Sequence, residues 1–284
     1  MSKAIATVHG AVSLVNAIAN KKGATLGIDL KVEAIVETSS GKGISIQSEN
    51  KSLSSRLINK TVEKIVSKKD LERNKISITL NSEIPLGYGL KSSSAISTAV
   101  ALACAKIFKP KLTDQQILLA GVDASIESKV SITGAYDDAC SCYYGGFNVT
   151  DNEKRKRVHH EKIPSNLIAV IFLPKNRKRG NLKNLQTLSS VFENAWNLAR
   201  NANYWEAMII NGLATATLLN SDTKIISNLL EKGAIGASIS GNGPSIAAIT
   251  KKENESNIKK VFSTLEGSVI VSKVNNQKAD VHEV

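Results

Sequence analysis

Residues 85–95 read PLGYGLKSSSA, and this stretch of proline, glycine, lysine and serine leads into the apolar run AISTAVALACA. The preceding residues 76–85 alternate like a strand, and the following residues have helical spacing. The first turn of a helix has unpaired N–H groups and partial positive charge. Glycines let backbone approach a phosphate closely, and serine hydroxyls bind phosphate oxygens or a metal. The segment therefore predicts a phosphate-binding loop, in which Lys91 adds a positive charge.

The same stretch also suits a serine-rich helix cap after a tight turn, a structure that binds no ligand. A Walker-type loop is excluded, because the pattern G-x-x-x-x-G-K-[ST] does not occur in the 284 residues. A second glycine segment, GAIGASISGNGPS at 233–245, favours the phosphate-binding interpretation, because two such loops in one chain are more specific than one.

Acidic residues lie between the two glycine segments. TGAYDDACS contains the adjacent pair Asp137 and Asp138, and Glu127 lies about ten residues upstream on the helical run VDASIES. Phosphoryl transfer needs phosphate-positioning donors, a magnesium ion held by oxygen ligands, and a group that orients or deprotonates the attacking hydroxyl. The acidic pair also suits a loop cap or an exposed surface, and Glu127 also suits an exposed helix position.

The spacing of apolar residues predicts a mixture of strands and helices. Strands are expected at 26–37, 44–48, 76–85, 167–174 and 268–274, and on both sides of the glycine loop within 235–250. Helices are expected at 53–69, 93–108, 183–201, 204–219, 223–232 and 254–265, with a further one opened by a capping box at 113–116. We interpret the first two strands as a hairpin. The irregular order predicts an α+β protein of two lobes, 1–150 and 151–284.

The chain carries 37 Lys and Arg against 25 Asp and Glu, a formal net charge of +12. This excess attracts anions such as nucleotides, phosphorylated metabolites, carboxylates or nucleic acid. Aromatic residues make up only 4% of the chain and the lysines are dispersed, so stacking platforms for bases are scarce. We therefore expect a small anionic ligand and no nucleic-acid partner, and we interpret the basic cluster at 154–157 as a solvated loop.

The cysteines and the N-terminal residues predict a cytoplasmic protein. Cys104, Cys140 and Cys142 are odd in number, and a Cys-x-Cys pair is too close for an ordinary disulfide. The first apolar stretch is interrupted by His9 and Asn16 and lacks a small-residue cleavage site, so we do not expect a signal peptide. No run reaches membrane-spanning length, so no membrane partner is expected.

The segment at 85–95 resembles the signature Pro-x-x-x-Gly-Leu-x-Ser-Ser-x-Ala of the GHMP kinase superfamily. The residues that fill the signature are Pro85, Gly89, Leu90, Ser92, Ser93 and Ala95. The segment at 233–245 resembles the C-terminal glycine motif of the same kinases, which implies that it lies beside the nucleotide phosphates and supports the first loop, so that the two segments meet in the fold. The resemblance implies ATP as a substrate and the two-lobed GHMP kinase fold, with a ribosomal protein S5 domain 2-like N-terminal lobe and a ferredoxin-like C-terminal lobe.

The resemblance also implies roles for individual residues. Asp137 corresponds to the catalytic aspartate, with Asp138 as the fallback, while Ser93 and Glu127 correspond to magnesium ligands. The residues implied in nucleotide binding are Pro85, Leu86, Gly87, Tyr88, Gly89, Leu90, Lys91, Ser92, Ser93, Ser94, Ala95, Gly241, Asn242 and Gly243.

The N-terminal stretch GAVSLVNAIANKKGATLGIDL resembles the start of archaeal-type shikimate kinases, and the resemblance runs in order from about residue 4 to residue 272. It implies that ATP phosphorylates the 3-hydroxyl of shikimate, giving shikimate 3-phosphate on the route to chorismate, with Asn16 and Asp137 at the substrate. The alternatives are a GHMP kinase for homoserine or mevalonate, and a non-catalytic nucleic-acid-binding protein.

The partner of the substrate carboxylate is left open between Lys21, Lys22 and the group Arg177, Lys178 and Arg179, each of which also suits a solvated loop. Mevalonate-type relatives carry a lysine in their first motif, and ATVHGAVSL here has none. A lone histidine in an apolar segment is more often structural than catalytic, so we interpret His9 as structural. The oligomeric state is left open.

Overall fold

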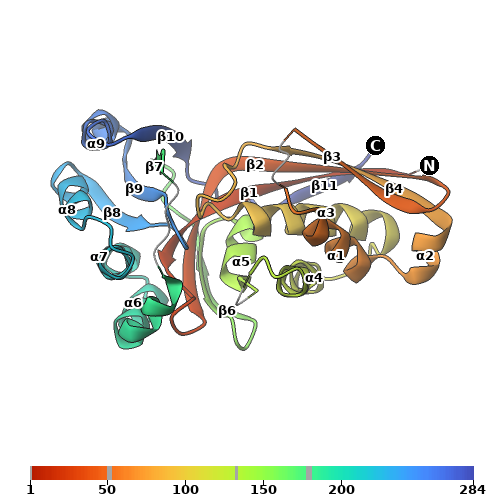
Figure 1. The fold of residues 1–284 in the computed structure, drawn as a ribbon, viewed down its shortest axis with the longest axis horizontal. Coiled ribbons are helices and arrows are strands. Elements are labelled where there is room, and N and C mark those ends of the chain that lie inside the picture. The colour runs from red at the N-terminus through yellow and green to blue at the C-terminus, as the bar shows by residue number, and fades with distance from the viewer. Residues whose placement is uncertain (1, 50–52, 132–133, 177–180) are drawn as a thin grey trace.

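A computed structural model of the chain describes residues 2–49, 53–131, 134–176 and 181–284. Figure 1 shows a long twisted sheet with helices against it at one end and a smaller sheet with its own helices at the other. The strands are β1 (Lys3–Val15), β2 (Lys22–Ser40), β3 (Gly43–Ser48), β4 (Asn74–Ser82), β5 (Phe147–Asp151), β6 (Lys156–Glu161), β7 (Leu167–Pro174), β8 (Ala234–Ile239), β9 (Ile246–Lys251), β10 (Gly267–Lys273) and β11 (Asp280–Glu283).

The α-helices are α1 (Ser55–Ile65), α2 (Lys68–Arg73), α3 (Ser92–Phe108), α4 (Asp114–Glu127), α5 (Tyr136–Tyr144), α6 (Ser189–Arg200), α7 (Tyr204–Leu218), α8 (Lys224–Glu231) and α9 (Glu255–Phe262). Two short 3₁₀ helices span Leu182–Leu188 and Lys252–Asn254. No helix in the described ranges is both long and apolar enough to cross a lipid bilayer.

The first sheet has the order β11-β1-β2-β4-β3, and β5 joins β2 and pairs with β6. The 19-residue strand β2 lies at the centre of this sheet and pairs antiparallel with β1 along most of its length. Its other edge pairs with β5 near its beginning and with β4 towards its end. Strands β6 and β11 belong to this sheet although both follow residue 150 in the chain. The first sheet therefore contains strands from both sides of that position.

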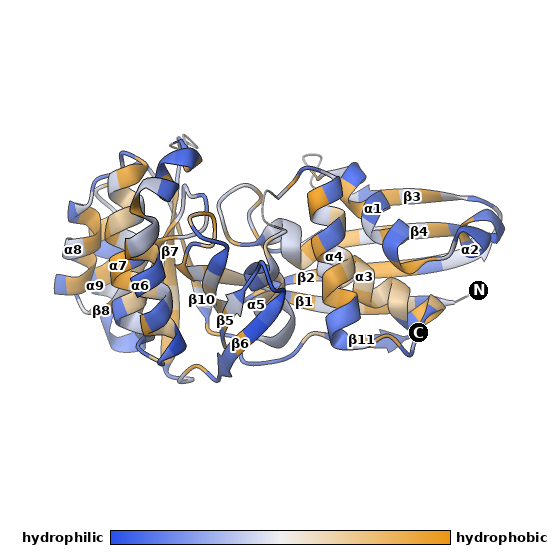
Figure 2. Cartoon of the chain, turned by 90° about the horizontal axis from the view of Figure 1, so that it is seen from below, coloured by the Kyte–Doolittle hydropathy of each residue, from blue (hydrophilic) through white to orange (hydrophobic). Residues whose placement is uncertain are grey.

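Helices α1, α3, α4 and α5 form the layer that packs with this sheet. Helix α3 contacts β1, β2, α1, α4 and α5, and its many alanines and serines allow these close approaches. Figure 2 shows α3 in the colours of apolar residues and the peripheral α2 mainly in those of hydrophilic ones. The buried position of α3 fixes the direction in which its N-terminus, and hence the segment before it, must point.

The second sheet has the order β10-β7-β9-β8 and is antiparallel throughout. Strand β7 is buried along most of its length, as its continuous apolar sequence LIAVIFLP predicts. Helices α7 and α8 contact β8, and α9 contacts β7. The glycine segment that connects β8 and β9 leaves this sheet on the side of β1.

The two-sheet architecture confirms the predicted α+β class, and most predicted strands and helices are present with small shifts at their ends. The capping box is confirmed, because the Thr113 hydroxyl accepts from the amide of Gln116 while the Gln116 side chain accepts from the amide of Thr113. The predicted hairpin of 26–37 with 44–48 is wrong. Strand β3 pairs in parallel with β4, because β1 and β4 already occupy both edges of β2.

Substitution of Gly212 tests how tightly α7 packs on β8. A Cβ atom at Gly212 would meet the carbonyl oxygen of Ala237, with the Cα of Ser238 at 3.0 Å. We expect Gly212→Ala to lower the free energy of unfolding by roughly 1–3 kcal/mol, although the same change in an open helix stabilises by about 1 kcal/mol. Urea unfolding measures this, with Thr217→Ala on the exposed face of α7 as the control. A Gly212→Ala protein as stable as wild type would contradict the packing.

Candidate active site

A cavity of about 270 Å³ lies where the first glycine segment, the second glycine segment, the end of β1 and the start of α5 come together. Serine and aspartate side chains, one lysine and several glycines dominate its wall. The lining residues are Ser13, Asn16, Ala17, Ile18, Gly87, Gly89, Lys91, Ser92, Ser93, Ser94, Ser125, Val130, Ser131, Ala135, Asp137, Asp138, Gly241 and Asn242.

The predicted phosphate-binding loop lies at this cavity. Gly87, Gly89 and Lys91 have positive φ angles of 81°, 78° and 67°, and this succession of left-handed residues turns the chain sharply into α3. The side chain of the N-cap residue Lys91 makes no capping hydrogen bond to the first turn of α3, at Ser92–Ser94. Because the backbone amides at a helix start need acceptors, this turn is suited to bind an anion such as a phosphate group.

The two glycine segments, about 150 residues apart in sequence, are in direct contact. The Ser240 hydroxyl donates a hydrogen bond to the carbonyl oxygen of Gly89 at 2.8 Å. A Cβ atom at Gly89 would collide with the carbonyl oxygen of Ser240, so the contact requires glycine there for space as well as for its positive φ angle. The contact places Gly241 and Asn242 in the same cavity wall as the start of α3.

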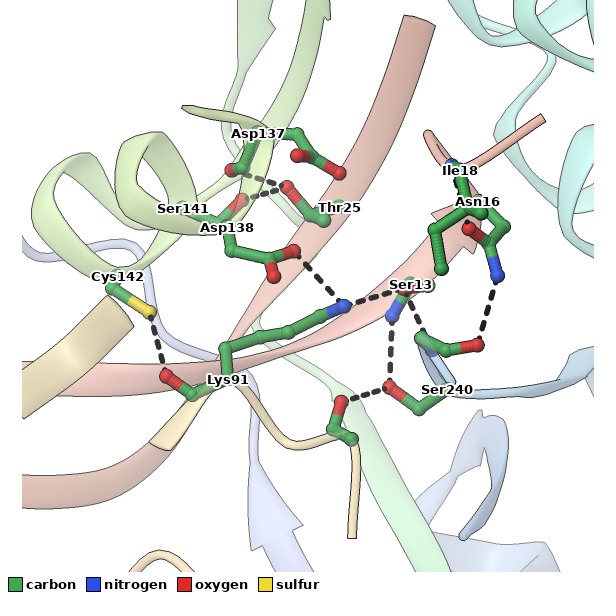
Figure 3. Close-up of polar contacts among 12 residues, drawn as sticks. Ser13, Asn16, Ile18, Thr25, Lys91, Asp137, Asp138, Ser141, Cys142 and Ser240 are labelled. Atoms are coloured by element: carbon green, nitrogen blue, oxygen red, sulfur yellow. Dashed lines mark hydrogen bonds and ion pairs between the residues drawn. The ribbon is translucent and has the colours of Figure 1, made fainter. Parts of the chain in front are cut away.

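The end of β1 joins the two glycine segments to each other. The Ser13 hydroxyl accepts hydrogen bonds from Lys91 Nζ at 2.7 Å and from the amide of Gly241 at 3.0 Å. The Asn16 side-chain amide donates to the carbonyl oxygen of Gly241 at 2.9 Å, and its oxygen accepts from the amide of Ile18 at 2.9 Å. Figure 3 shows these contacts from the three segments converging on one point.

Asp137 lies in the first turn of α5 and is almost completely buried. Its carboxylate accepts a hydrogen bond from the Asn152 side chain at 2.7 Å, and Gly23 of β2 leaves it space, because a Cβ there would strike the carboxylate. Burial first, and then the negative charge of Asp138, raise the pKa of Asp137 to about 7. A carboxylate that titrates near neutral pH is suited to act as a general base.

Asp138 forms an ion pair with Lys91 at 2.9 Å (Figure 3). Burial disfavours the charged form of Lys91, but the nearby carboxylates of Asp138 and Asp137 outweigh it and raise the pKa of Lys91. Lys91 therefore stays charged at neutral pH. The loop before α3 thus supplies a lysine to the cavity, whereas the stretch ATVHGAVSL of β1 has none. The cavity combines donors suited to an anion with a carboxylate of raised pKa, the groups that phosphoryl transfer requires.

Part of the predicted phosphate-loop set lies behind the cavity wall. Leu90 and Ala95 are fully buried in the core, and the Tyr88 hydroxyl donates to the carbonyl oxygen of Pro174 at 3.4 Å. The other predicted nucleotide-binding residues that do not line the cavity are Pro85, Leu86 and Gly243. These residues shape the two loops, whereas the lining is formed mainly by glycine and serine.

Other predicted residues lie away from the cavity wall. Glu127, at the exposed end of α4, forms an ion pair with Lys64 of α1. Lys21 pairs with Glu153 at 2.8 Å, and Lys22 pairs with Glu193 at 2.6 Å. His9 Nε2 lies 3.5 Å from the carboxylate of Asp29, and burial lowers its pKa, as the structural interpretation expects. Arg177, Lys178 and Arg179 lie outside the described residues.

Ser13, Ser240 and Asn152 were not predicted from the sequence. Ser13 lies inside a strand of mostly apolar residues, and no local pattern marks such a serine as functional. Asn152 contacts Asp137 only because the turn after β5 lies beside the start of α5. For Ser240 the signal was available, since it immediately precedes the glycines of the second segment.

Comparison with known proteins gives the family. Residues 56–146 match the model of the GHMP kinases N-terminal domain, and residues 190–265 match that of the GHMP kinases C-terminal domain. A shikimate kinase of Methanosarcina acetivorans is 39% identical over 96% of this chain and 95% of its own. The chain belongs to the GHMP kinase family, among the archaeal shikimate kinases. A shikimate kinase of Pyrococcus furiosus is 35% identical over 84% of this chain and 89% of its own.

Solved structures of other kinases share the fold. Homoserine kinase from Cytophaga hutchinsonii superposes with a TM-score of 0.76 at 20% identity, covering 98% of this chain and 97% of that one. Mevalonate kinase from Methanococcus jannaschii gives 0.75 at 18% identity, covering 96% and 98%. The two-lobed GHMP kinase fold is therefore confirmed, and the family membership confirms an ATP-dependent kinase.

The pKa of Asp137 predicts the pH dependence of the kinase reaction. A base acts in its deprotonated form, so kcat/KM should rise with pH through about 7 in the wild type. Asp138→Asn removes the neighbouring negative charge and should lower the pKa of Asp137. The activity that this variant keeps should therefore rise at a lower pH than that of the wild type. Asp137→Asn should lower kcat at least about 100-fold at every pH. Steady-state ADP formation between pH 5 and 9 measures all three proteins.

Asp114→Asn serves as the control, because this carboxylate pairs with Lys278 outside the cavity. It should keep the wild-type pH profile. If Asp138→Asn abolished the reaction while Asp137→Asn kept both activity and the pH dependence, Asp138 would be the base.

Proposed function

We propose that the protein transfers the terminal phosphoryl group of ATP to the 3-hydroxyl of shikimate, giving shikimate 3-phosphate and ADP. The observation that carries the choice of acceptor is the near-full-length similarity to relatives named shikimate kinase, at 30–39% identity for the first six of them. The homoserine and mevalonate kinases among the solved structures are at most 20% identical and support the fold alone.

The cavity suggests how its residues divide the work. The terminal phosphates would lie on the first turn of α3, with Lys91 beside them. Asp137 would take the proton of the attacking hydroxyl as the bond from that oxygen to phosphorus forms. The bond from phosphorus to the bridging oxygen of ADP breaks in the same transfer. Asp138 holds the ammonium group of Lys91 in place by their ion pair.

The substrate would lie against the residues that follow β1. Both side-chain groups of Asn16 already bind backbone atoms, so its contribution would be to hold Ala17 and Ile18 in the cavity wall. Lys21 and Lys22 are each paired with a carboxylate. Among the described residues that line the cavity, Lys91 is the one cation, and its ion pair with Asp138 holds it at the proposed phosphate site. The proposed partners of the shikimate carboxylate are therefore still Lys21, Lys22 and the group Arg177, Lys178 and Arg179.

Magnesium fits the oxygen groups of the cavity. This ion prefers oxygen ligands, retains several waters, and binds to one or two protein groups together with substrate phosphates. Ser93 and the two aspartates supply a hydroxyl and carboxylates in the cavity wall. Glu127 would have to leave Lys64 to join them. The bound ion would neutralise phosphate charge, and Ser93 and Glu127 remain its proposed protein ligands.

We also propose that the chain divides into two lobes and that the protein is cytoplasmic. Residues 1–150 would supply the phosphate loop and the acidic pair, and residues 151–284 the second glycine segment. The three cysteines are buried free thiols, and burial raises the pKa of Cys104 and Cys140 to about 12. Such unreactive thiols suit a reducing cytoplasm, and small molecules remain the only partners proposed.

A panel of acceptors tests the proposed function. With ATP and magnesium, the wild-type protein should form ADP in the presence of shikimate, at a kcat/KM at least about 100-fold above those for homoserine and mevalonate, because a site built to bind substrate hydroxyls rejects unmatched ones. A coupled ADP assay measures this, with Asp137→Ala as the inactive control. Turnover with homoserine or mevalonate instead would overturn the acceptor and leave the fold unaffected.

The metal assignment is tested by Glu127→Gln. If Glu127 joins the metal site in the complex with ATP, the magnesium concentration for half-maximal activity should rise about tenfold. Lys64→Ala is the matched control, since it removes the same ion pair and leaves the carboxylate free to bind the metal. An unchanged magnesium requirement in Glu127→Gln would assign this residue to the α1–α4 contact only.

A further inference from the structure

Ser13 lies near the end of β1, is only 1% exposed, and borders the active-site cavity. Its backbone amide donates to the Ser240 hydroxyl at 3.1 Å, which fixes the strand at this point. Its own hydroxyl accepts hydrogen bonds from the Lys91 ammonium group and the Gly241 amide, at 2.7 and 3.0 Å. Figure 3 shows the Ser13 side chain between the lysine and the second glycine segment.

The two bonds that Ser13 accepts determine what its hydroxyl hydrogen can do. A serine hydroxyl has two acceptor positions and one hydrogen to donate. Neither an ammonium group nor a backbone amide can accept that hydrogen, and both acceptor positions are already filled. Within the described ranges, the Ser13 hydroxyl donates no hydrogen bond to a protein acceptor. The hydrogen is therefore available to an acceptor in the cavity that the residue borders.

We propose that the Ser13 hydroxyl donates a hydrogen bond to a non-bridging oxygen of the phosphoryl group during its transfer. The proposal rests on the proposed kinase function, but not on shikimate as the acceptor. Ser13 would act beside Lys91 and the start of α3, two other groups that favour an anion. Two donors bound to the hydroxyl oxygen polarise its O–H bond and strengthen the bond that it donates.

The chemistry of the step leaves Ser13 unchanged. The acceptor oxygen forms a bond to phosphorus, the bond to the ADP oxygen breaks, and the proton of the acceptor hydroxyl goes to Asp137. Ser13 keeps its own proton and contributes a fixed donor where the charge of the phosphoryl oxygens is redistributed. Removal of one such preorganised donor typically costs about 100-fold to 1000-fold in kcat.

Ser13→Ala should therefore lower kcat about 100-fold, while the KM values for ATP and for the acceptor change less than about threefold. Ser13→Thr keeps a hydroxyl, so its kcat should be at least about tenfold higher than that of Ser13→Ala. Ser272→Ala is the matched control, because Ser272 is another buried strand serine that donates to the carbonyl oxygen of Lys273 and does not line the cavity. It should keep wild-type kinetics.

A binding measurement separates this proposal from the choice of acceptor. ADP with magnesium and aluminium fluoride mimics a phosphoryl group in transfer, and calorimetry measures its affinity without any acceptor. Ser13→Ala should weaken this complex at least tenfold and leave the affinity for ADP with magnesium within about threefold. Equal affinity of wild type and Ser13→Ala for the fluoride complex, or an equal loss for ADP alone, would overturn the role. If the wild-type protein did not phosphorylate shikimate but the two proteins still differed in affinity for the fluoride complex, only the choice of acceptor would be overturned.

Discussion

The active site depends on one close approach of backbone, between Gly89 in the first glycine segment and Ser240 before the second. The hydrogen bond from the Ser240 hydroxyl and the absence of a side chain at Gly89 bring two parts of the chain into contact that belong to different sheets. The start of α3, Lys91 and Gly241 then line one cavity. Helix α3 is buried against the first sheet, and β8 and β9 hold the second glycine segment in place. Neither loop can therefore change its position without disturbing the packing of the other.

Charge in the cavity is unevenly matched, with two buried or half-buried carboxylates and one ammonium group. Lys91 is closest to Asp138, and this pairing leaves Asp137 as the carboxylate with the raised pKa. Two adjacent acids thereby acquire different environments, a common way for an active site to separate the roles of two carboxylates. Both aspartates lie in the first turn of α5, where the helix dipole favours their negative charge. The same few contacts therefore set the position and the acidity of the proposed base.

Much of the fold and the general place of the site were predictable from sequence, because they depend on local signals. Glycines and serines before a helix indicated a loop at the start of α3, and this loop lines the cavity. The Thr113–Gln116 pair predicted a helix start, and the order of the motifs indicated the family. The family resemblance implied that the two glycine segments meet, but the other contacts between distant segments were not predictable. The pairing of β3 with β4, the ion pairs of Glu127, Lys21 and Lys22, and the position of Ser13 all depend on how separate elements pack. A single sequence holds no local pattern for such contacts.

Lys91 has a left-handed backbone conformation with a φ angle of 67°, which glycine adopts more easily than lysine does. A non-glycine residue in such a conformation costs on the order of 1 kcal/mol or more. Glycine at this point would relieve the backbone but would remove the one cation among the described residues lining the cavity. Backbone strain and the charge of the cavity therefore favour different residues at this position, so a substitution that makes the loop more stable would also change the electrostatics of the cavity.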